Sequence, residues 1–226
     1  MKQRVETLAL LIIVDMIIIF LCLTVWHQWN TDAARSSAAA EETKILALTF
    51  DDGPHPKYTK KLLEGLKKRN VKATFFLVGE NITGNETLVA QMAEDGHLIG
   101  THCYSHEDLT KKSAEEACKD ILKTNQMIEA ITGHRPEYIR PPYGIWSAEL
   151  EDCVDMTTVL WDIDTLDWKR QNRDAIVRHI EKNVGKHRII LMHDVFEPSV
   201  DAAFTAIDTL TKQGYTFVTI DELMID

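Results

Sequence analysis

Residues 44–54 read KILALTFDDGP, an apolar run that stops at two adjacent carboxylates, Asp51 and Asp52. A run this apolar predicts a strand that is buried on both faces, as strands are in a parallel sheet covered by helices. The Gly-Pro pair that follows predicts a turn. A plain loop turn is the alternative explanation for the two carboxylates, and this stretch alone favours that structural role.

The alternation of short apolar runs with amphipathic segments continues to the C-terminus. We expect strands over residues 44–50, 73–79, 97–103, 157–164, 187–194 and 215–220, and an extended segment that starts at residue 137. We expect helices over residues 58–69, 85–96, 173–184 and 199–213, and a long helix between a capping box at Ser113 and Glu116 and its end at Gly133. Strands that alternate with helices indicate an α/β fold with a parallel sheet, either open or closed into a barrel.

Polar side chains stand where the predicted strands end. They are Asp51, Asp52, His102, Arg140, Asp164 and His193. The carboxyl ends of parallel strands share one rim, and folds of this kind place their sites there. We therefore expect these side chains to lie close together although they are far apart in the chain.

The stretch GTHCYSHEDLT, residues 100–110, supplies two imidazoles four positions apart. The spacing predicts that His102 and His106 lie on one side of a helical turn. With the carboxylate of Asp52 they form a three-ligand set that leaves a position for water, which is the pattern of catalytic rather than structural zinc sites. Cys103 adjoins the first histidine, so we expect its side chain to point away and to pack. Surface decoration is the alternative explanation for a histidine pair alone.

Three further motifs offer the other groups that a hydrolytic site needs. RPPYG, residues 140–144, offers the cation of Arg140 and the backbone N–H of Tyr143. DTLDWK, residues 164–169, offers Asp167, and LMHD, residues 191–194, offers His193. Each motif is weak alone. Together with Asp51, Asp52, His102 and His106, these motifs supply the ligands of a metal, a base, an acid, an orienting carboxylate and an oxyanion donor.

TFDDGP, the H-x-x-x-H pair, RPPYG, DTLDW and ILMHD occur in the order of the five motifs of polysaccharide deacetylases, which form carbohydrate esterase family 4 and share the nodulation-protein-B homology domain. The chain resembles this family from about Ile45 to Leu223. WDIDTLDWK (161–169) and QGYTFVTIDELM (213–224) look most like the peptidoglycan N-acetylglucosamine deacetylases of Gram-positive bacteria. The resemblance implies an α/β fold that is a distorted (β/α) barrel with fewer or irregular strands.

By this resemblance Asp51 is the general base and Asp52 is the aspartate that binds the metal. His102 and His106 match the two histidine ligands, and Arg140 matches the arginine that holds the catalytic aspartate. The resemblance implies a divalent metal cofactor. Zn²⁺ is our first choice, and Co²⁺ and Ni²⁺ bind such ligands as well.

The remaining matches concern the acid and the substrate. Asp167 resembles the aspartate that orients and charges the catalytic acid, His193, and Tyr143 the residue whose backbone N–H faces the oxyanion. Trp168 and Leu191 resemble the apolar walls that hold the acetyl methyl group. The resemblance thus implies that one group takes a proton from water while another protonates the departing amine.

The activity implied by the resemblance is metal-dependent removal of N-acetyl groups from the N-acetylglucosamine residues of cell-wall peptidoglycan. The alternatives are deacetylation of N-acetylmuramic acid or chitin, O-deacetylation of another wall polymer, and a non-catalytic, membrane-tethered glycan-binding protein. The chain departs from the family in one place, because Cys103 stands where Ser or Thr is usual. Its thiol is the weaker hydrogen-bond donor.

The N-terminus predicts a membrane anchor. An apolar run over residues 8–25 follows Lys2 and Arg4, and as a helix it spans about 27 Å, close to the thickness of the hydrocarbon core. We expect residues 1–29 to be a cytoplasmic tip and a transmembrane signal anchor, residues 30–43 an extracellular linker, and residues 44–226 the catalytic domain. The protein is then a single-pass protein of the cell membrane with its domain outside, and cleavage with secretion is the alternative.

Charge and cysteine content restrict the partners. The first forty residues carry three basic and three acidic side chains, so the formal net charge of −10 belongs to the remainder. An acidic domain predicts no nucleic-acid partner. We expect a cell-wall glycan as partner and a monomeric catalytic domain. Cys103, Cys118 and Cys153 are odd in number, so no disulfide scaffold is expected.

Overall fold

The computed structural model describes residues 16, 18–29, 44–151, 154–185 and 188–225. The chain divides into two compact units, residues 1–43 and residues 44–226, which are described separately. In the first unit, residues 18–29 are helical. Of the residues that the structure describes, no helix combines the length and the apolar character needed to cross a membrane. Residues 8–15 and 17 of the expected anchor, and the expected linker, lie outside that part of the chain.

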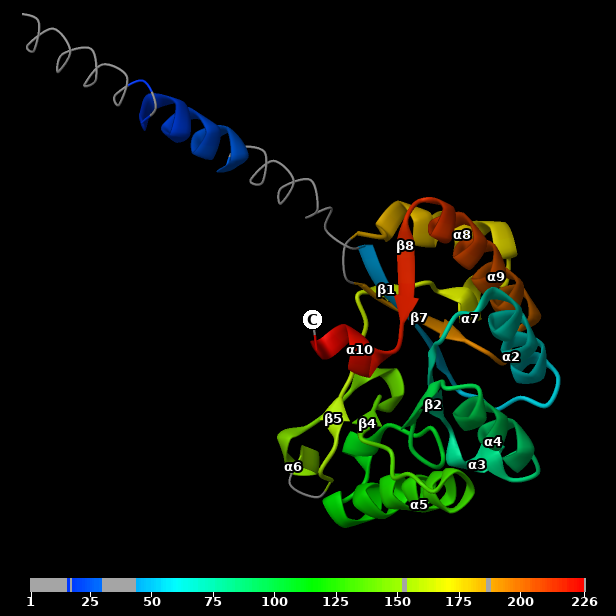
Figure 1. Ribbon diagram of the computed structural model, residues 1–226. Coiled ribbons are helices and arrows are strands. Elements are labelled where there is room, and N and C mark those ends of the chain that lie inside the picture. Colours follow the sequence, from blue (N-terminus) through cyan, green and yellow to red (C-terminus); the bar gives the residue numbers. More distant parts are fainter. Residues whose placement is uncertain (1–15, 17, 30–43, 152–153, 186–187, 226) are drawn as a thin grey trace, which may run out of the picture. The chain divides into compact units, whose positions relative to one another are not determined.

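The second unit alternates strands and helices along the chain (Figure 1). Its strands are β1 (Lys44–Asp51), β2 (Thr74–Leu77), β3 (Leu98–Thr101), β4 (Tyr138–Ile139), β5 (Thr157–Thr158), β6 (Ile163–Asp164), β7 (Arg188–His193) and β8 (Tyr215–Val218). Its α-helices are α2 (Tyr58–Arg69), α3 (Gly79–Ile82), α4 (Glu86–Glu94), α5 (Ala114–Thr132), α6 (Ala148–Glu151), α7 (Asp167–Arg170), α8 (Arg173–Asn183), α9 (Glu197–Lys212) and α10 (Ile220–Ile225). Two short 3-10 helices are η1 (Leu109–Lys111) and η2 (Pro142–Gly144).

The strands form one curled sheet around β1. Neighbours follow the order β5-β4-β3-β2-β1-β7-β6, and β8 pairs with the first half of β1. Every pairing between described strands is parallel. Because β5 and β6 form the two opposite edges of this order, the sheet is a half-barrel that strand pairing does not close. The expectation of an α/β fold with a distorted (β/α) barrel is confirmed.

One expected strand is wrong. Residues 157–164 form β5 and β6 at opposite edges of the sheet rather than a single strand. The chain crosses between the edges at Val159 and Leu160, whose carbonyls accept hydrogen bonds from the guanidinium of Arg140 at 3.2 and 3.0 Å. These carbonyls bond to a side chain instead of a neighbouring strand, so the ladder is interrupted there.

The helix ends show which local signals the sequence carries. α5 begins at the expected capping box of Ser113 and Glu116 and ends at Gly133, whose φ of 76° is left-handed. The last helix, α10, was not expected because the apolar run of β8 leads directly into it. The carboxylate of Glu222 accepts hydrogen bonds from the N–H and the hydroxyl of Thr219, which is a second pair of capping type.

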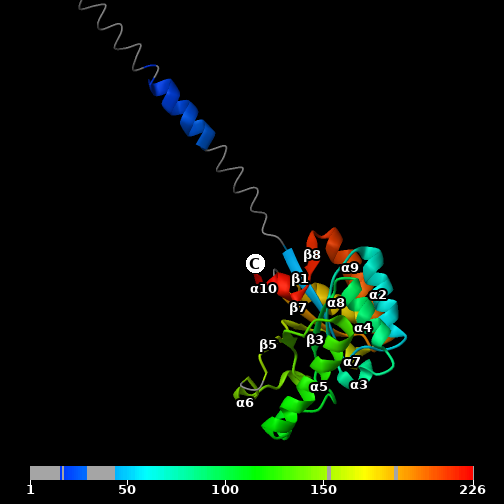
Figure 2. The same cartoon turned by 60° about the horizontal axis from the view of Figure 1, so that its bottom comes forward.

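The helices pack against the sheet and bury its core. α9 packs against α2 and α8, whereas α5 packs against α4 and α6 (Figure 1, and Figure 2 from another side). In the main core Phe50 and Phe75 stack with ring centroids 5.5 Å apart. Burial of each such ring contributes about 1.5–3 kcal/mol. Cys118, on α5, is disulfide-bonded, which the cysteine count did not indicate.

Arg140 is fully buried and also donates a hydrogen bond to Asp51. We predict that Arg140→Leu lowers the free energy of unfolding by about 3–5 kcal/mol, because it removes the cation that pairs with the buried carboxylate of Asp51 and the donor that bonds the buried carbonyl of Val159. Urea denaturation of the metal-free protein measures this. Arg135→Leu, at an exposed arginine shortly before β4, is the matched control. A loss in Arg140→Leu no larger than in the control would contradict the prediction.

Candidate active site

The parallel register brings distant residues to one rim. β1 and β7 are neighbours, and their register pairs Asp51 with His193. In the strand order, β3 and β4 lie on the side of β1 away from β7 and pair with each other. His102 directly follows β3, and Arg140 directly follows β4. The side chains expected at the strand ends therefore meet at the carboxyl edge of the sheet.

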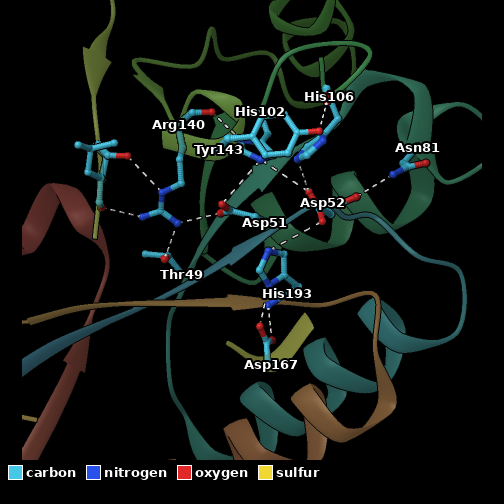
Figure 3. Close-up of polar contacts among 12 residues, drawn as sticks. Thr49, Asp51, Asp52, Asn81, His102, His106, Arg140, Tyr143, Asp167 and His193 are labelled. Carbon is cyan, nitrogen blue, oxygen red and sulfur yellow. Dashed lines mark hydrogen bonds and ion pairs between the residues drawn. The ribbon is translucent and has the colours of Figure 1, made fainter. Parts of the chain in front are cut away.

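Three side chains of metal-binding type converge at this rim (Figure 3). Oδ1 of Asp52 lies 3.6 Å from Nε2 of His102 and 3.3 Å from Nε2 of His106. One ligand atom from each of the three residues lies within 4.8 Å of the others. A tetrahedral ion with bonds of about 2.1 Å holds its ligands roughly 3.4 Å apart, so these separations suit an ion of the size of zinc.

Two further features of the set fit a bound cation. Oδ1 of Asp52 is buried and has no hydrogen-bond partner within the described part of the chain. Nδ1 of His102 lies 2.6 Å from the backbone oxygen of Arg140. Because a carbonyl only accepts, Nδ1 carries the proton, and Nε2 of the neutral ring keeps a free lone pair. Burial lowers the pKa of His102 and so favours this neutral form.

The loop that carries the histidines is not the helical turn that the spacing predicts. Residues 102–106 follow β3 without helical structure, and Cys103 and His106 have left-handed φ angles of 66° and 52°. The loop nevertheless brings the rings of His102 and His106 together, with centroids 4.9 Å apart. The side chain of Cys103 is buried in a cluster with Ile121 and Ile139, which confirms that it packs.

Asp52, His102 and His106 are called the metal-type set below. Asp51 lies beside this set and is paired with the buried cation of Arg140. Nη1 of Arg140 donates to Oδ1 of Asp51 at 2.8 Å and to the hydroxyl of Thr49 at 2.7 Å. Asp51 is only 3% exposed. Its other oxygen, Oδ2, lies 3.8 Å from Nε2 of His102. One oxygen of Asp51 is thus fixed by the guanidinium, while the other faces the space where a water would meet the set.

His193 faces the same set from β7 and is held by a buried carboxylate. Nδ1 of His193 donates to Oδ1 of Asp167 at 2.7 Å, and its backbone N–H donates to Oδ2 at 2.8 Å. Nε2 therefore points into the site, 3.9 Å from Oδ2 of Asp52. Burial alone would lower the pKa of His193, but the hydrogen bond and charge of Asp167, with the charges of Asp51 and Asp52, raise it to about 9. The ring is consequently protonated near neutral pH.

These groups line a cavity of about 320 Å³. Trp168, Leu191 and Tyr143 form part of its wall. Tyr143 has a left-handed φ of 60°, and its ring meets that of His106 edge-on with centroids 5.0 Å apart. Arg140 and Asp167 stand behind the cavity, bonded to residues that line it. The structure therefore brings all the site residues expected from the sequence into one place.

Several residues at the site were not expected from the sequence: Thr49, Asn81, Trp161 and Asp194. Trp161 lines the cavity, and its signal was an aromatic residue at the end of an apolar run. Asp194 directly follows His193, and burial raises its pKa to about 7. Its carboxyl group accepts a hydrogen bond from Thr59 and leaves no room for a side chain at Gly53. Asn81 carried no signal, because an asparagine in a short helix is ordinary.

Comparison with known proteins gives a family and several relatives. The profile of the family named polysaccharide deacetylase matches residues 38–157. The peptidoglycan-N-acetylmuramic acid deacetylase PdaC of Bacillus subtilis is 43% identical over 180 residues, which cover 80% of this chain and 38% of that protein. The peptidoglycan-N-acetylglucosamine deacetylase PgdA of Listeria monocytogenes is 39% identical over 184 residues, with coverages of 81% and 40%. This chain thus spans about two fifths of the length of these two relatives.

Solved structures share the fold. The structure of PdaC from Bacillus subtilis has a TM-score of 0.79 and 42% identity, and covers 81% of this chain and 91% of that one. A pseudoenzyme of carbohydrate esterase family 4 from Bacillus anthracis has a TM-score of 0.75 and 33% identity, with coverages of 80% and 66%. The same fold therefore occurs in proteins described as enzymes and in one described as a pseudoenzyme.

Titration of the metal-free protein tests the pair of Asp167 and His193. We predict a pKa of about 9 for His193 in the wild type, and in Asp167→Asn a pKa that falls toward the ordinary value of 6.5. NMR of the imidazole Cε1–H measures both. Since the pKa is higher in the folded state, the pair stabilises the fold below about pH 6.5, and this contribution is lost as the pH rises through 9. Asp164→Asn, in the same cavity, is the control. An equal shift in both variants would refute the assignment.

Proposed function

The chain belongs to the polysaccharide deacetylase family, and we propose that it hydrolyses the N-acetyl groups of N-acetylglucosamine residues in cell-wall peptidoglycan. One observation carries the proposal. Two ion pairs flank the metal-type set, Asp51 with Arg140 and His193 with Asp167. In the first pair the acidic residue faces the cavity, and in the second pair the basic residue does. The first pair presents a carboxylate to the cavity, and the second presents an imidazolium, so the site holds a proton acceptor and a proton donor together.

The metal ligands in this proposal are Asp52, His102 and His106. Among divalent ions we propose Zn²⁺, because one oxygen and two imidazole nitrogens are a set typical of catalytic zinc, and Co²⁺ or Ni²⁺ are the alternatives. Bound there, the ion supplies Lewis acidity, which acidifies water and polarises the acetamide carbonyl.

Residues of the chain carry out the two proton transfers. Oδ2 of Asp51 accepts a proton from the attacking water, while Arg140 fixes the other oxygen. The water oxygen forms a bond to the acetamide carbon, and the bond between that carbon and nitrogen breaks. Nε2 of His193 donates its proton to the leaving nitrogen, and Asp167 keeps the ring charged and oriented until then. Acetate and a free amine are the products.

Three residues of the cavity wall complete the proposed site. The backbone N–H of Tyr143 stabilises the negative charge that develops on the acetamide oxygen. Trp168 and Leu191 contact the acetyl methyl group. Both residues line the cavity, where the side chain of Trp168 is half-exposed and that of Leu191 is buried. They therefore offer apolar surface for a small group such as a methyl.

A polymeric substrate is favoured by a second cavity that adjoins the first. It has a volume of about 630 Å³ and shares His106 and Tyr143 with the catalytic cavity. The exposed side chains of Tyr143 and Ile145 offer apolar surface on which sugar rings can stack. A small amide would need only the catalytic cavity, whereas a glycan chain would extend from it into the second one.

A second candidate substrate has specific support. PdaC, whose name gives N-acetylmuramic acid as its substrate, is 43% identical to this chain over 180 residues, so deacetylation of that sugar is the alternative. O-deacetylation uses the same groups and has no observation in its favour. A non-catalytic glycan-binding role is disfavoured because the proposed ligands, acid and base are all present.

Acetate release from N-acetylglucosamine oligomers tests the activity. We predict that the full-length protein releases acetate, that a chelator stops the release, and that Zn²⁺ restores it. His106→Ala should lower the rate by about 10²-fold or more through loss of a metal ligand. His134→Ala, at an exposed histidine far from the rim, should leave the rate unchanged. Release that withstands both the chelator and His106→Ala would rule out the proposed chemistry.

Mass spectrometry of muropeptides identifies the sugar. In cells that lack the protein, a larger fraction of the glucosamine residues should carry an acetyl group. A larger acetylated fraction of muramic acid, with glucosamine unchanged, would establish the alternative substrate.

For the location, we propose that the apolar run of residues 8–25 anchors the protein in the cell membrane with the catalytic unit outside. Lys2 and Arg4 before the run support this orientation. The apolar side chains of the described helix, such as Phe20 and Leu23, are exposed. The disulfide at Cys118 agrees with an oxidising compartment.

Fractionation tests the anchor. The full-length protein should stay with the membranes after washing at high salt, which removes proteins held by charge alone. A mature N-terminus within residues 30–43, found by N-terminal sequencing of the native protein, would replace the anchor with cleavage and secretion.

A further inference from the structure

The segment Val78–Asn81, which is the residue after β2 and the first three residues of α3, lies between the two loops that carry the metal-type set. The aspartate loop follows β1 and contains Asp52 and Gly53. The histidine loop follows β3 and runs from His102 to His106. The strand order places β2 between β1 and β3, so the segment after β2 emerges between the two loops.

Two hydrogen bonds tie the segment to the aspartate loop. The side-chain amide of Asn81 donates to the backbone oxygen of Asp52 at 2.7 Å (Figure 3). The backbone N–H of Val78 donates to the oxygen of Gly53 at 3.0 Å. Asp52 has a left-handed φ of 75°, a conformation that costs on the order of 1–3 kcal/mol outside glycine. The two bonds therefore hold a strained residue in the orientation that points its carboxylate at the histidines.

Two more hydrogen bonds tie the segment to the histidine loop. The N–H of Gly79 donates to the oxygen of Cys103 at 2.9 Å, and the N–H of Glu80 donates to the oxygen of Tyr104 at 3.0 Å. Gly79 is packed so closely against Thr124 and Tyr104 that a side chain at this position would clash with both. One short segment thus holds the backbones that carry all three proposed ligands.

We propose that Asn81 is a positioning residue for the metal site: its amide fixes the Asp52 backbone, and the segment Val78–Asn81 clasps the aspartate and histidine loops in the geometry that binds the metal. The proposal rests on the metal-dependent function proposed above. Asn81 lies outside the set of ligands and outside the catalytic cavity, so it acts through Asp52 alone.

The exposure of Asn81 separates positioning from packing. Its side chain is exposed, so a change there leaves the core intact. Partners that orient a metal ligand typically change metal affinity 10- to 100-fold when they are removed. Loss of the Asn81 amide should therefore appear in metal affinity and leave the stability of the metal-free protein nearly unchanged.

The test compares three variants of the full-length protein. Asn81→Ala removes the amide, Asn81→Leu replaces it with an uncharged group of similar shape, and Glu80→Ala changes the exposed neighbour on the same helix. Zn²⁺ affinity is measured without substrate, by competition with a chromophoric chelator, and thermal unfolding is measured with the metal removed. We expect both Asn81 variants to bind Zn²⁺ about tenfold more weakly or worse, and Glu80→Ala to match the wild type.

Three results would overturn the proposal. They are unchanged Zn²⁺ affinity in both Asn81 variants, equal weakening in Glu80→Ala, and a loss of affinity matched by an equal loss of metal-free stability, which would assign Asn81 to folding. Because no substrate is present, these results are distinct from failure of the proposed function, which would appear as Zn²⁺ binding by the wild type without acetate release.

Discussion

A buried guanidinium has five N–H donors and needs partners for them, and that of Arg140 makes four hydrogen bonds to two separate parts of the chain. It bonds Thr49 and Asp51 on β1, and it bonds the carbonyls of residues 159 and 160, where the sheet is interrupted. Its backbone oxygen accepts the proton of His102. Arg140 therefore contacts the crossing between the two edge strands, the proposed base and one proposed metal ligand.

Two carboxylates take part in the proposed mechanism: Asp51 as the base, and Asp167 as the partner of the acid His193. They differ in the groups to which they are bonded. Asp51 lines the cavity and is bonded through Oδ1 to the permanent cation of Arg140, and in the proposed mechanism its other oxygen accepts the proton of water. Asp167 is fully buried and bonded to His193, so it raises the affinity of that imidazole for a proton and does not itself meet the substrate. In the proposed mechanism, two aspartates therefore have different roles because their partners differ.

The rim was predictable from the sequence because the site residues stand at the ends of apolar strands or within a few residues after them, and parallel strands end at one edge. The ends of α5 were predictable from a capping box and a glycine. The break within residues 157–164 was not, since the carbonyls there bond the side chain of Arg140, which no local pattern in that segment indicates. Nor was the role of Asn81 predictable, because the bond to Asp52 joins residues from separate strand–loop units. Local signals therefore predict α5 with both of its ends, whereas contacts between distant residues determine the break at 159–160 and the bond of Asn81 to Asp52.

Anomalous diffraction at the zinc edge from crystals of the Zn²⁺-loaded protein tests the central claim most directly. The account predicts a peak bonded to Oδ1 of Asp52 and to Nε2 of both His102 and His106, with Asp51 close by but not a ligand. A peak bonded to Asp51 in place of Asp52, or no peak at this rim, would contradict the account.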